Sequence, residues 1–208
     1  MHHIMNAKDL SGQEHHRLLS GSVVPRPIAF VTTLSTEDVG VVNAAPFSFF
    51  NVVSSDPPLV SISISRKKGV MKDTARNALH HKELVIHLTD QSILHGVNET
   101  AASLEANESE LNLTKFHVKP SEIIATPGII EAKIRFECVL YQHIPVTNER
   151  GDIMNDLILA KVVCYHLSNE VYDAQKGYVS SQSLQPVARL AGQDYANIGQ
   201  VYSINRPV

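Results

Sequence analysis

The sequence predicts an all-β core of antiparallel strands with peripheral helices, arranged as a barrel or a sandwich. Apolar and polar residues alternate with a period of two along residues 59–65 and again along 129–146. The turn sequence "NERGD" at 148–152 then separates the second stretch from an apolar run at 157–168, which predicts a long hairpin. Helical patterns do not follow each strand in turn, so a parallel α/β sheet is not expected.

Length and charge favour one globular domain over residues 1–208, with a core at about 20–170 and a C-terminal arm at 171–208. The net charge is −3 and no long basic run occurs, so nucleic acid is not an expected partner. No stretch approaches the roughly 20 apolar residues that cross a bilayer, and the first residues do not resemble a signal peptide. We therefore expect no membrane partner and a cytoplasmic location.

Residues 8–20 predict a short helix that ends near Gly21. Residues 26–34, "RPIAFVTTL", predict the first strand, and Pro25 and Pro27 bend its entry.

A turn at 35–40 leads to further strand-forming residues at 41–50, "VVNAAPFSFF". This stretch is unusual for a buried strand, because Asn43 and Ser48 interrupt its apolar residues and Asn51 follows it directly. After it, Val60, Ile62 and Ile64 alternate with Leu59, Ser61, Ser63 and Ser65, so one face is apolar and the other is largely polar.

Asp73 or Thr74 is expected to cap a helix that continues to Leu79, and residues 83–89 predict another strand. Residues 91–112 mix helical and polar patterns. The pattern gives six or seven strands in all, and the polar segment from Val171 onward is expected to be an ordered arm outside the core.

Several common chemistries have no support in the sequence. The motifs HExxH, GxSxG, GxxxxGK[ST] and GxGxxG are all absent, and no cysteine pair has zinc-finger spacing. Cys138 and Cys164 both lie in apolar runs, where a thiolate is disfavoured. We therefore expect no metal and assign no catalytic residue.

An anion-binding pattern remains at residues 61–74. Ser61, Ser63 and Ser65 precede Arg66, Lys67, Lys68 and Lys72, and Thr74 stands near the predicted helix start. Hydroxyls, cations and a helix N-terminus together suit a phosphate group. Asp73 would repel that group unless it caps the helix or pairs with Lys72. A solvated basic turn beside a capped helix is the alternative.

Asn43, Ser48 and Asn51 add polar side chains, and Ala44 and Ala45 leave room for a flat group near the backbone. A planar ring with a phosphate tail would use both stretches. The alternative is a kinked core strand whose polar groups are satisfied internally.

Five stretches occur in a recognisable order: "RPIAFVTT", "GVVNAAPFSFFNVVSSDPPLVSISI", "KDTARNA", "FEC" and "PVARLAGQDYA". Together they resemble the flavin reductase-like, FMN-binding split-barrel family, which includes flavoredoxin-type proteins. The resemblance spans roughly residues 20–200. One departure is "RLAG" at 189–192, where the family pattern is "RLGG".

The resemblance implies a six-stranded antiparallel Greek-key split barrel that forms a homodimer, with FMN in a groove near the subunit interface. Asn43, Ala44, Ala45, Pro46 and Ser48 would contact the ring and ribityl parts. The phosphate would be surrounded by Ser63, Ser65, Arg66, Lys72, Asp73 and Thr74. Arg26, Arg189 and Tyr195 would contact the ring edge or a nicotinamide. Residues 100–113 receive no role.

The activity that the resemblance implies is transfer of a hydride from NADH or NADPH to FMN, with electrons passed on to free flavin, a flavin-dependent oxygenase or another redox partner. Two alternatives stay open. The chain can be an FMN electron carrier that another protein reduces, or a pyridoxamine-phosphate-oxidase-like barrel with another phosphate-bearing cofactor.

Overall fold

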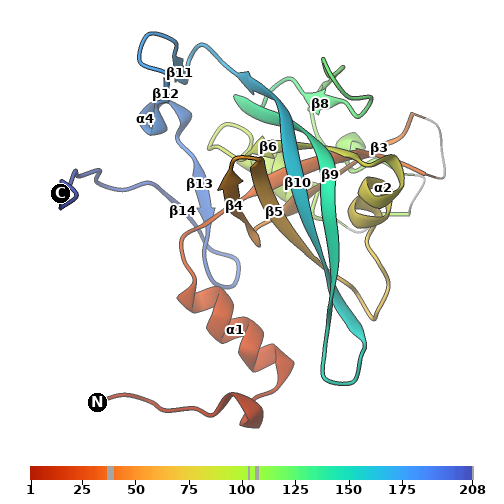
Figure 1. The fold of residues 1–208 in the computed structure, drawn as a ribbon, viewed down its shortest axis with the longest axis vertical. Coiled ribbons are helices and arrows are strands. Elements are labelled where there is room, and N and C mark those ends of the chain that lie inside the picture. The colour runs from red at the N-terminus through yellow and green to blue at the C-terminus, as the bar shows by residue number, and fades with distance from the viewer. Residues whose placement is uncertain (37–39, 103, 106–107, 208) are drawn as a thin grey trace.

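The computed structural model describes residues 1–36, 40–102, 104–105 and 108–207, so residues 37–39 of the predicted turn lie outside the described residues. Its centre is an antiparallel seven-stranded sheet with the order β3-β2-β6-β9-β10-β5-β4 (Figure 1). The strands are β2 (Ala29–Leu34), β3 (Val42–Phe47), β4 (Phe50–Ser55), β5 (Pro58–Ser65), β6 (Glu83–Leu88), β9 (Ile134–Thr147) and β10 (Ile153–Leu167). The predicted all-β core is confirmed.

The strand count of six is wrong, because the sheet has seven strands and does not close by hydrogen bonds into a complete barrel. The sequence of residues 41–50 reads as one continuous strand. In the structure the chain turns at Ser48 and Phe49, and β4 begins at Phe50. β3 and β4 are the two edges of the same sheet, so this short turn forces the sheet to curl. The amide of Ser63 donates to the Phe49 carbonyl at 2.9 Å, which fixes the turn against β5.

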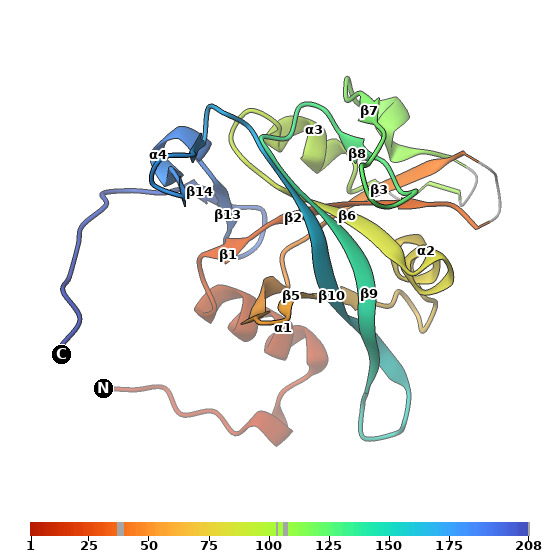
Figure 2. The same ribbon diagram turned by 45° about the horizontal axis from the view of Figure 1, so that its top comes forward.

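The predicted alternation along β5 is confirmed. Ile62 and Ile64 are buried, whereas Ser63 is half-buried and Ser65 is exposed. The predicted hairpin is also present, and β9 and β10 pair along nearly their whole length. Its far end extends beyond the rest of the sheet (Figure 2).

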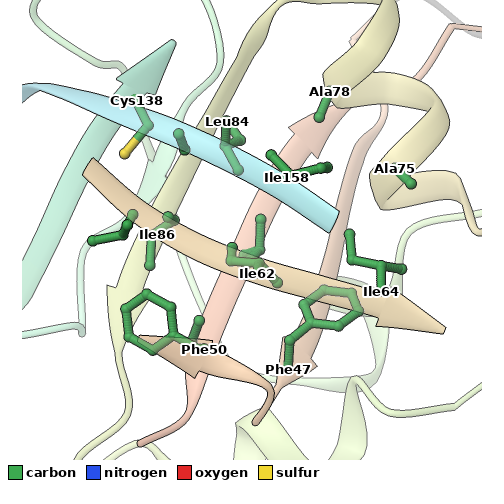
Figure 3. Close-up of a cluster of buried hydrophobic side chains, with 14 of the residues drawn as sticks. Phe47, Phe50, Ile62, Ile64, Ala75, Ala78, Leu84, Ile86, Cys138 and Ile158 are labelled. Atoms are coloured by element: carbon green, nitrogen blue, oxygen red, sulfur yellow. The ribbon is translucent and has the colours of Figure 1, made fainter. Parts of the chain in front are cut away.

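The main core lies inside the curled sheet, where apolar side chains from all seven strands of the sheet meet (Figure 3). Helix α2 (Asp73–His81) packs on this cluster through Ala75 and Ala78, whose small side chains let the helix approach closely. A second cluster lies under α3 (Leu94–Glu99) and the 3-10 helix η2 (Glu110–Leu113), around Phe30 and Val97.

The N-terminal helix differs from the prediction. After a 3-10 turn, η1 (Ala7–Asp9), helix α1 runs over Gly12–Ser22 and so continues past Gly21. The helix starts where Ser11 and Glu14 form a capping box, with each side chain satisfying the backbone amide of the other.

Only part of the segment after residue 170 is the peripheral arm that the sequence suggests: residues 198–207 are exposed and lack helix or strand, but part of the chain before them packs on the core. Val171 and Leu184 are buried against Ile134 in a third core cluster. Single apolar residues in a polar segment leave no periodicity from which this packing can be predicted. The elements are β11 (Tyr172–Asp173), β12 (Tyr178–Val179), α4 (Ser181–Leu184), β13 (Val187–Arg189) and β14 (Tyr195–Asn197).

β13 and β14 form a three-stranded sheet with β1 (Arg26–Pro27), which joins the two ends of the chain (Figure 2). A small pair, β7 (Val118–Lys119) and β8 (Gly128–Ile129), completes the fold. Of the helices described, none has both the length and the apolar character to span a bilayer.

A buried ion pair fastens β5 to the hairpin. The Asp156 carboxylate is fully buried and accepts hydrogen bonds from Nε and Nη2 of Arg66, both at 2.8 Å. His143 Nε2 lies 2.9 Å from the same carboxylate. Burial alone would raise the pKa of Asp156, but the bonds from Arg66 and His143 outweigh burial and hold this pKa below its ordinary value.

We expect Asp156→Asn to lower the free energy of unfolding at neutral pH by clearly more than the loss of an exposed ion pair would, because Arg66 and His143 would lose the buried carboxylate that both contact. The contribution of Asp156 is fully present above the ordinary Asp pKa of about 4 and is lost as the pH falls through the depressed folded-state pKa. Denaturant unfolding between pH 7 and pH 3 should therefore show a steeper loss of stability in the wild type than in the variant.

The matched control is Asp152→Asn, because Asp152 and Arg150 are both exposed and 3.7 Å apart. This control should cost less than about 1 kcal/mol. Equal losses in the two variants would contradict the role given to the Arg66–Asp156 pair.

Candidate functional site

A groove runs over the edge strand β3 and consists of two hollows that share Pro46 and Ala101. The first has a volume of about 160 Å³, and the second a volume of about 220 Å³. Of the predicted site residues, the first hollow collects Asn43, Ala45, Pro46, Lys72, Asp73 and Thr74. The second collects Pro46, Ser48, Arg189 and Tyr195. Residues far apart in the sequence thus meet along one groove.

A buried polar network forms the base of the first hollow. Asn43 Nδ2 donates to both carboxylate oxygens of Glu110 at 2.9 and 3.0 Å, and the amide of Ala44 donates to Glu110 Oε2 at 3.0 Å. Thr74 Oγ1 donates to Asn43 Oδ1 at 2.9 Å. Burial raises the pKa of Glu110 despite these donors. The Asn43 side chain is therefore satisfied internally, and it positions β3, η2 and α2 relative to one another.

Sequence reasoning missed Glu110, which falls in a region to which it assigned no role. A lone Glu in a polar stretch carries no local signal of burial. Only the tertiary fold brings it opposite Asn43, which lies 67 positions earlier.

The start of α2 differs from the prediction in a way that matters for the site. Lys72, not Asp73 or Thr74, occupies the cap position, and no side chain caps the helix. Asp73 instead pairs with Arg76 at 2.7 Å. Lys72 is exposed, and its Nζ lies 5.9 Å from the centre of the Phe47 ring. Among the described residues Lys72 forms no ion pair, so this end of the groove offers a cation and uncapped amides to an anion.

The edge of β3 is suited to a flat group. The Ala44 amide points off the sheet, since it bonds to Glu110 rather than to β2. Alternate residues of a strand direct their backbone groups to the same side, so residue 46 would point its amide outward as well. That residue is Pro46, which has no N–H. An apolar ring can therefore lie against this edge without burying an unpaired donor.

The second hollow has apolar walls with a polar rim. Ile28, Phe47 and Val97 contribute to the walls. The Tyr195 hydroxyl donates to Asn98 Oδ1 at 3.0 Å, and the Arg189 guanidinium lies 4.4 Å from the centre of the Tyr195 ring. These contacts hold Tyr195 in place. The hollow, called the slot below, therefore combines apolar walls with a fixed polar rim, which suits a flat heterocycle with polar edges.

Five predicted residues do not line this groove, and one of them is Ala44, whose side chain is fully buried in the second core cluster. Ser63 and Ser65 accept hydrogen bonds from Asn155 Nδ2 at 3.1 and 2.9 Å, and Arg66 is engaged by Asp156. Arg26 is buried and donates to the carbonyls of Ser20, Val23 and Leu190, so it joins α1 to the β13–β14 turn. It lines a third hollow, which adjoins the second one.

Among the described residues, one group of potential metal ligands lies close together: the ligand atoms of Glu137, Cys164 and His166 are all within 4.8 Å of one another. His166 Nδ1 lies 3.2 Å from Nη2 of Arg135, which can only donate. Nδ1 therefore accepts, and Nε2 carries the proton that it donates to Glu137 at 2.5 Å. Glu137 also accepts the amides of Glu122, Ile123 and Ile124. This arrangement anchors a loop and leaves His166 Nε2 no lone pair for a metal.

The cysteines are not activated nucleophiles. Burial raises the pKa of both the Cys138 thiol and the Cys164 thiol. A thiol with a raised pKa stays protonated at neutral pH.

Comparison with known proteins identifies the family to which the chain belongs. A family model described as "Flavin reductase like domain" matches residues 20–183. The protein YwrF of Bacillus subtilis is 53% identical over 99% of both chains. Among solved structures, nitrilotriacetate monooxygenase component B from Bacillus cereus is 42% identical, with a TM-score of 0.94 and coverage of 98% of this chain and 99% of that one. The 2-nitrobenzoate 2-nitroreductase NbaA of Pseudomonas fluorescens is 30% identical, with a TM-score of 0.87 and coverage of 99% and 96%. The chain therefore belongs to the flavin reductase-like family, as its sequence motifs predicted.

Proposed function

We propose that the chain is an FMN-binding reductase of the Greek-key split-barrel type, which transfers a hydride from NADH or NADPH to the flavin. The observation that carries this proposal is the continuous groove. It joins an apolar slot with a polar rim to an end formed by Lys72 and the uncapped start of α2. A flavin with a phosphate tail has the same order of chemical features.

The residues present fit FMN. The slot beside Pro46 and Tyr195 suits the ring system, and Lys72 with the first amides of α2 suits the phosphate. Asp73 does not oppose this assignment strongly, because Arg76 pairs with its carboxylate. Ser63, Ser65 and Arg66 would reach the phosphate only after a rearrangement, so we give them a lesser part.

When bound, FMN supplies the hydride-accepting chemistry, and the protein supplies binding, orientation and shelter from water. Ile28, Phe47 and Val97 would exclude water from one face of the ring. Ser48 and Arg189 offer donors at the rim, where negative charge is favoured. Within the part of the chain that the structure describes, none of the residues lining the slot is a carboxylic acid or a histidine. Hydride transfer needs no general acid or base from the protein, and this composition is consistent with it.

The electron acceptor is a separate proposal. The name of the Bacillus cereus structure describes it as a component of a monooxygenase, and that of NbaA as a nitroreductase. We propose an oxygenase component as the partner of this chain, because the component B structure is the more similar of the two. The cytoplasmic location expected from the sequence stays a prediction.

The hydride transfer is tested by anaerobic addition of NADH or NADPH to the FMN-loaded protein. We expect the flavin absorbance near 450 nm, about where oxidised flavins absorb, to bleach within seconds, since both substrates would meet in the groove. If the colour persists with both donors but disappears with dithionite, the chain is an electron carrier. If the protein does not bind FMN at all, another phosphate-bearing cofactor is indicated.

Lys72→Ala should weaken FMN binding by about 1–3 kcal/mol, because a charge-assisted contact to the phosphate is lost. Titration of the apoprotein with FMN, followed by flavin fluorescence, measures this change. Riboflavin, which lacks the phosphate, should bind both proteins equally. The matched control is Lys67→Ala in the same loop, since Lys67 is also exposed but lines neither hollow. An unchanged FMN affinity in the Lys72 variant would contradict the placement of the phosphate at this end of the groove.

We also propose a homodimer, because exposed apolar side chains gather on β4 and the hairpin. They include Val52, Val53, Tyr141, Val146 and Met154, which are 42–71% exposed. Sedimentation velocity at micromolar concentration should give a dimer that Val52→Lys weakens. Ile123→Lys is the control, since Ile123 is 65% exposed on a loop outside these elements. A stable wild-type monomer that retains FMN would contradict the dimer.

A further inference from the structure

A third hollow of about 590 Å³ adjoins the slot and shares Ser48 and Arg189 with it. Its walls come from four parts of the chain: α1, β1, the turn between β3 and β4, and the turn between β13 and β14. No sequence motif marks this hollow, because its residues range from His16 to Gly192.

The hollow is basic. His16, Arg17, Arg26 and Arg189 line it, and no Asp or Glu among the described residues does. Of the residues that the structure describes, none forms an ion pair with Arg17 or Arg189. The Arg26 guanidinium lies near enough to Arg189 for the two charges to repel, and burial together with this repulsion lowers the pKa of Arg26. Glu14 lies near enough to Arg17 for their charges to interact, but Glu14 does not line the hollow. The lining therefore carries an excess of positive charge, which favours an anionic ligand.

Arg26 also builds the wall. It donates to the Ser20 and Val23 carbonyls at the end of α1 and to the Leu190 carbonyl across the hollow. These bonds hold α1 over the opening. Arg26 is therefore a positioning residue, whereas Arg17 is exposed and free to contact a ligand.

An aromatic surface completes the hollow. Phe49 is 40% exposed, and the His16 ring centre lies 6.3 Å from the Phe49 ring centre. An exposed ring beside cations suits a base attached to phosphates, because the base can stack while the phosphates pair with the guanidinium groups.

From these features we propose that the hollow binds the adenosine diphosphate half of the nicotinamide dinucleotide. The shared residues Ser48 and Arg189 let one ligand extend from this hollow into the slot, so the nicotinamide would reach the flavin ring. The inference rests on the proposed reductase function. It adds a recognition site for the donor, with Arg17 and Arg189 as its phosphate ligands and Phe49 as its stacking surface.

The test uses ADP-ribose, which carries the adenosine and both phosphates but cannot transfer a hydride. Isothermal titration of the FMN-loaded protein should show binding that Arg17→Gln weakens about tenfold, the loss expected for one charge-assisted hydrogen bond. Raising the salt concentration should weaken wild-type binding more than that of the variant. The matched control is Arg150→Gln, an exposed arginine on the distant hairpin, which should bind like the wild type.

The same proteins are then mixed with NADH and NADPH. A tenfold rise in KM with an unchanged kcat in Arg17→Gln would support the proposal. Bleaching by NADH without any Arg17-dependent binding of ADP-ribose would overturn the inference and leave the reductase function standing. Arg17-dependent binding of ADP-ribose without bleaching would keep the site and refute the reductase function.

One further outcome would also overturn the inference. If Arg17→Gln lowers the affinity for FMN but not for ADP-ribose, the hollow holds the flavin phosphate instead. A comparison of FMN and riboflavin binding to the variant identifies that case, because riboflavin has no phosphate.

Discussion

The structure depends on one constraint: the two edges of a seven-stranded sheet are joined by only two residues. Ser48 and Phe49 connect β3 to β4, so these strands cannot move apart as the edges of an open sheet would. The sheet has to curl, and the curl creates the interior that Phe47, Phe50 and Ile62 fill. The same turn supplies residues to the slot and to the basic hollow. The element that shapes the core therefore also stands at the centre of the proposed site.

A curled sheet that does not close leaves edge strands with unpaired backbone N–H and C=O groups. Such groups can pair with another chain and cause aggregation. On β3 the problem is solved by side chains. Glu110 accepts the Ala44 amide, and Pro46 has no amide to leave unpaired. Burial of the Glu110 carboxylate at this edge raises its pKa. Hydrogen bonds from Asn43 to Glu110 and from Thr74 to Asn43 complete the polar network that forms the base of the groove.

The sequence was sufficient for the parts that depend on local patterns. Alternation along β5 and the turn at 148–152 predicted the β5 strand and the hairpin correctly. The motif residues Asn43, Pro46, Lys72 and Thr74 line one hollow, although their binding role stays a prediction. The prediction failed where long-range contacts decide. The carboxylate of Asp156 lies beside Arg66 only because β5 and β10 pair, and that ion pair draws Arg66 away from the groove. Glu110, Val171 and Leu184 are isolated residues whose burial no periodicity reveals.

The small sheet of β1, β13 and β14 has a consequence for how the protein matures. Pro46 and Lys72 precede β6, β9 and β10 of the seven-stranded sheet, whereas Arg189 and Tyr195 are synthesised only after its last strand, β10. The seven-stranded sheet ends at residue 167, so it can assemble before the strands that wall the slot are available. The slot can thus be completed only after the strands of the core have been synthesised. A chain cut short before β13 would keep its main hydrophobic core but would lack one side of the proposed binding site. Such an arrangement keeps an incomplete polypeptide from presenting a finished groove.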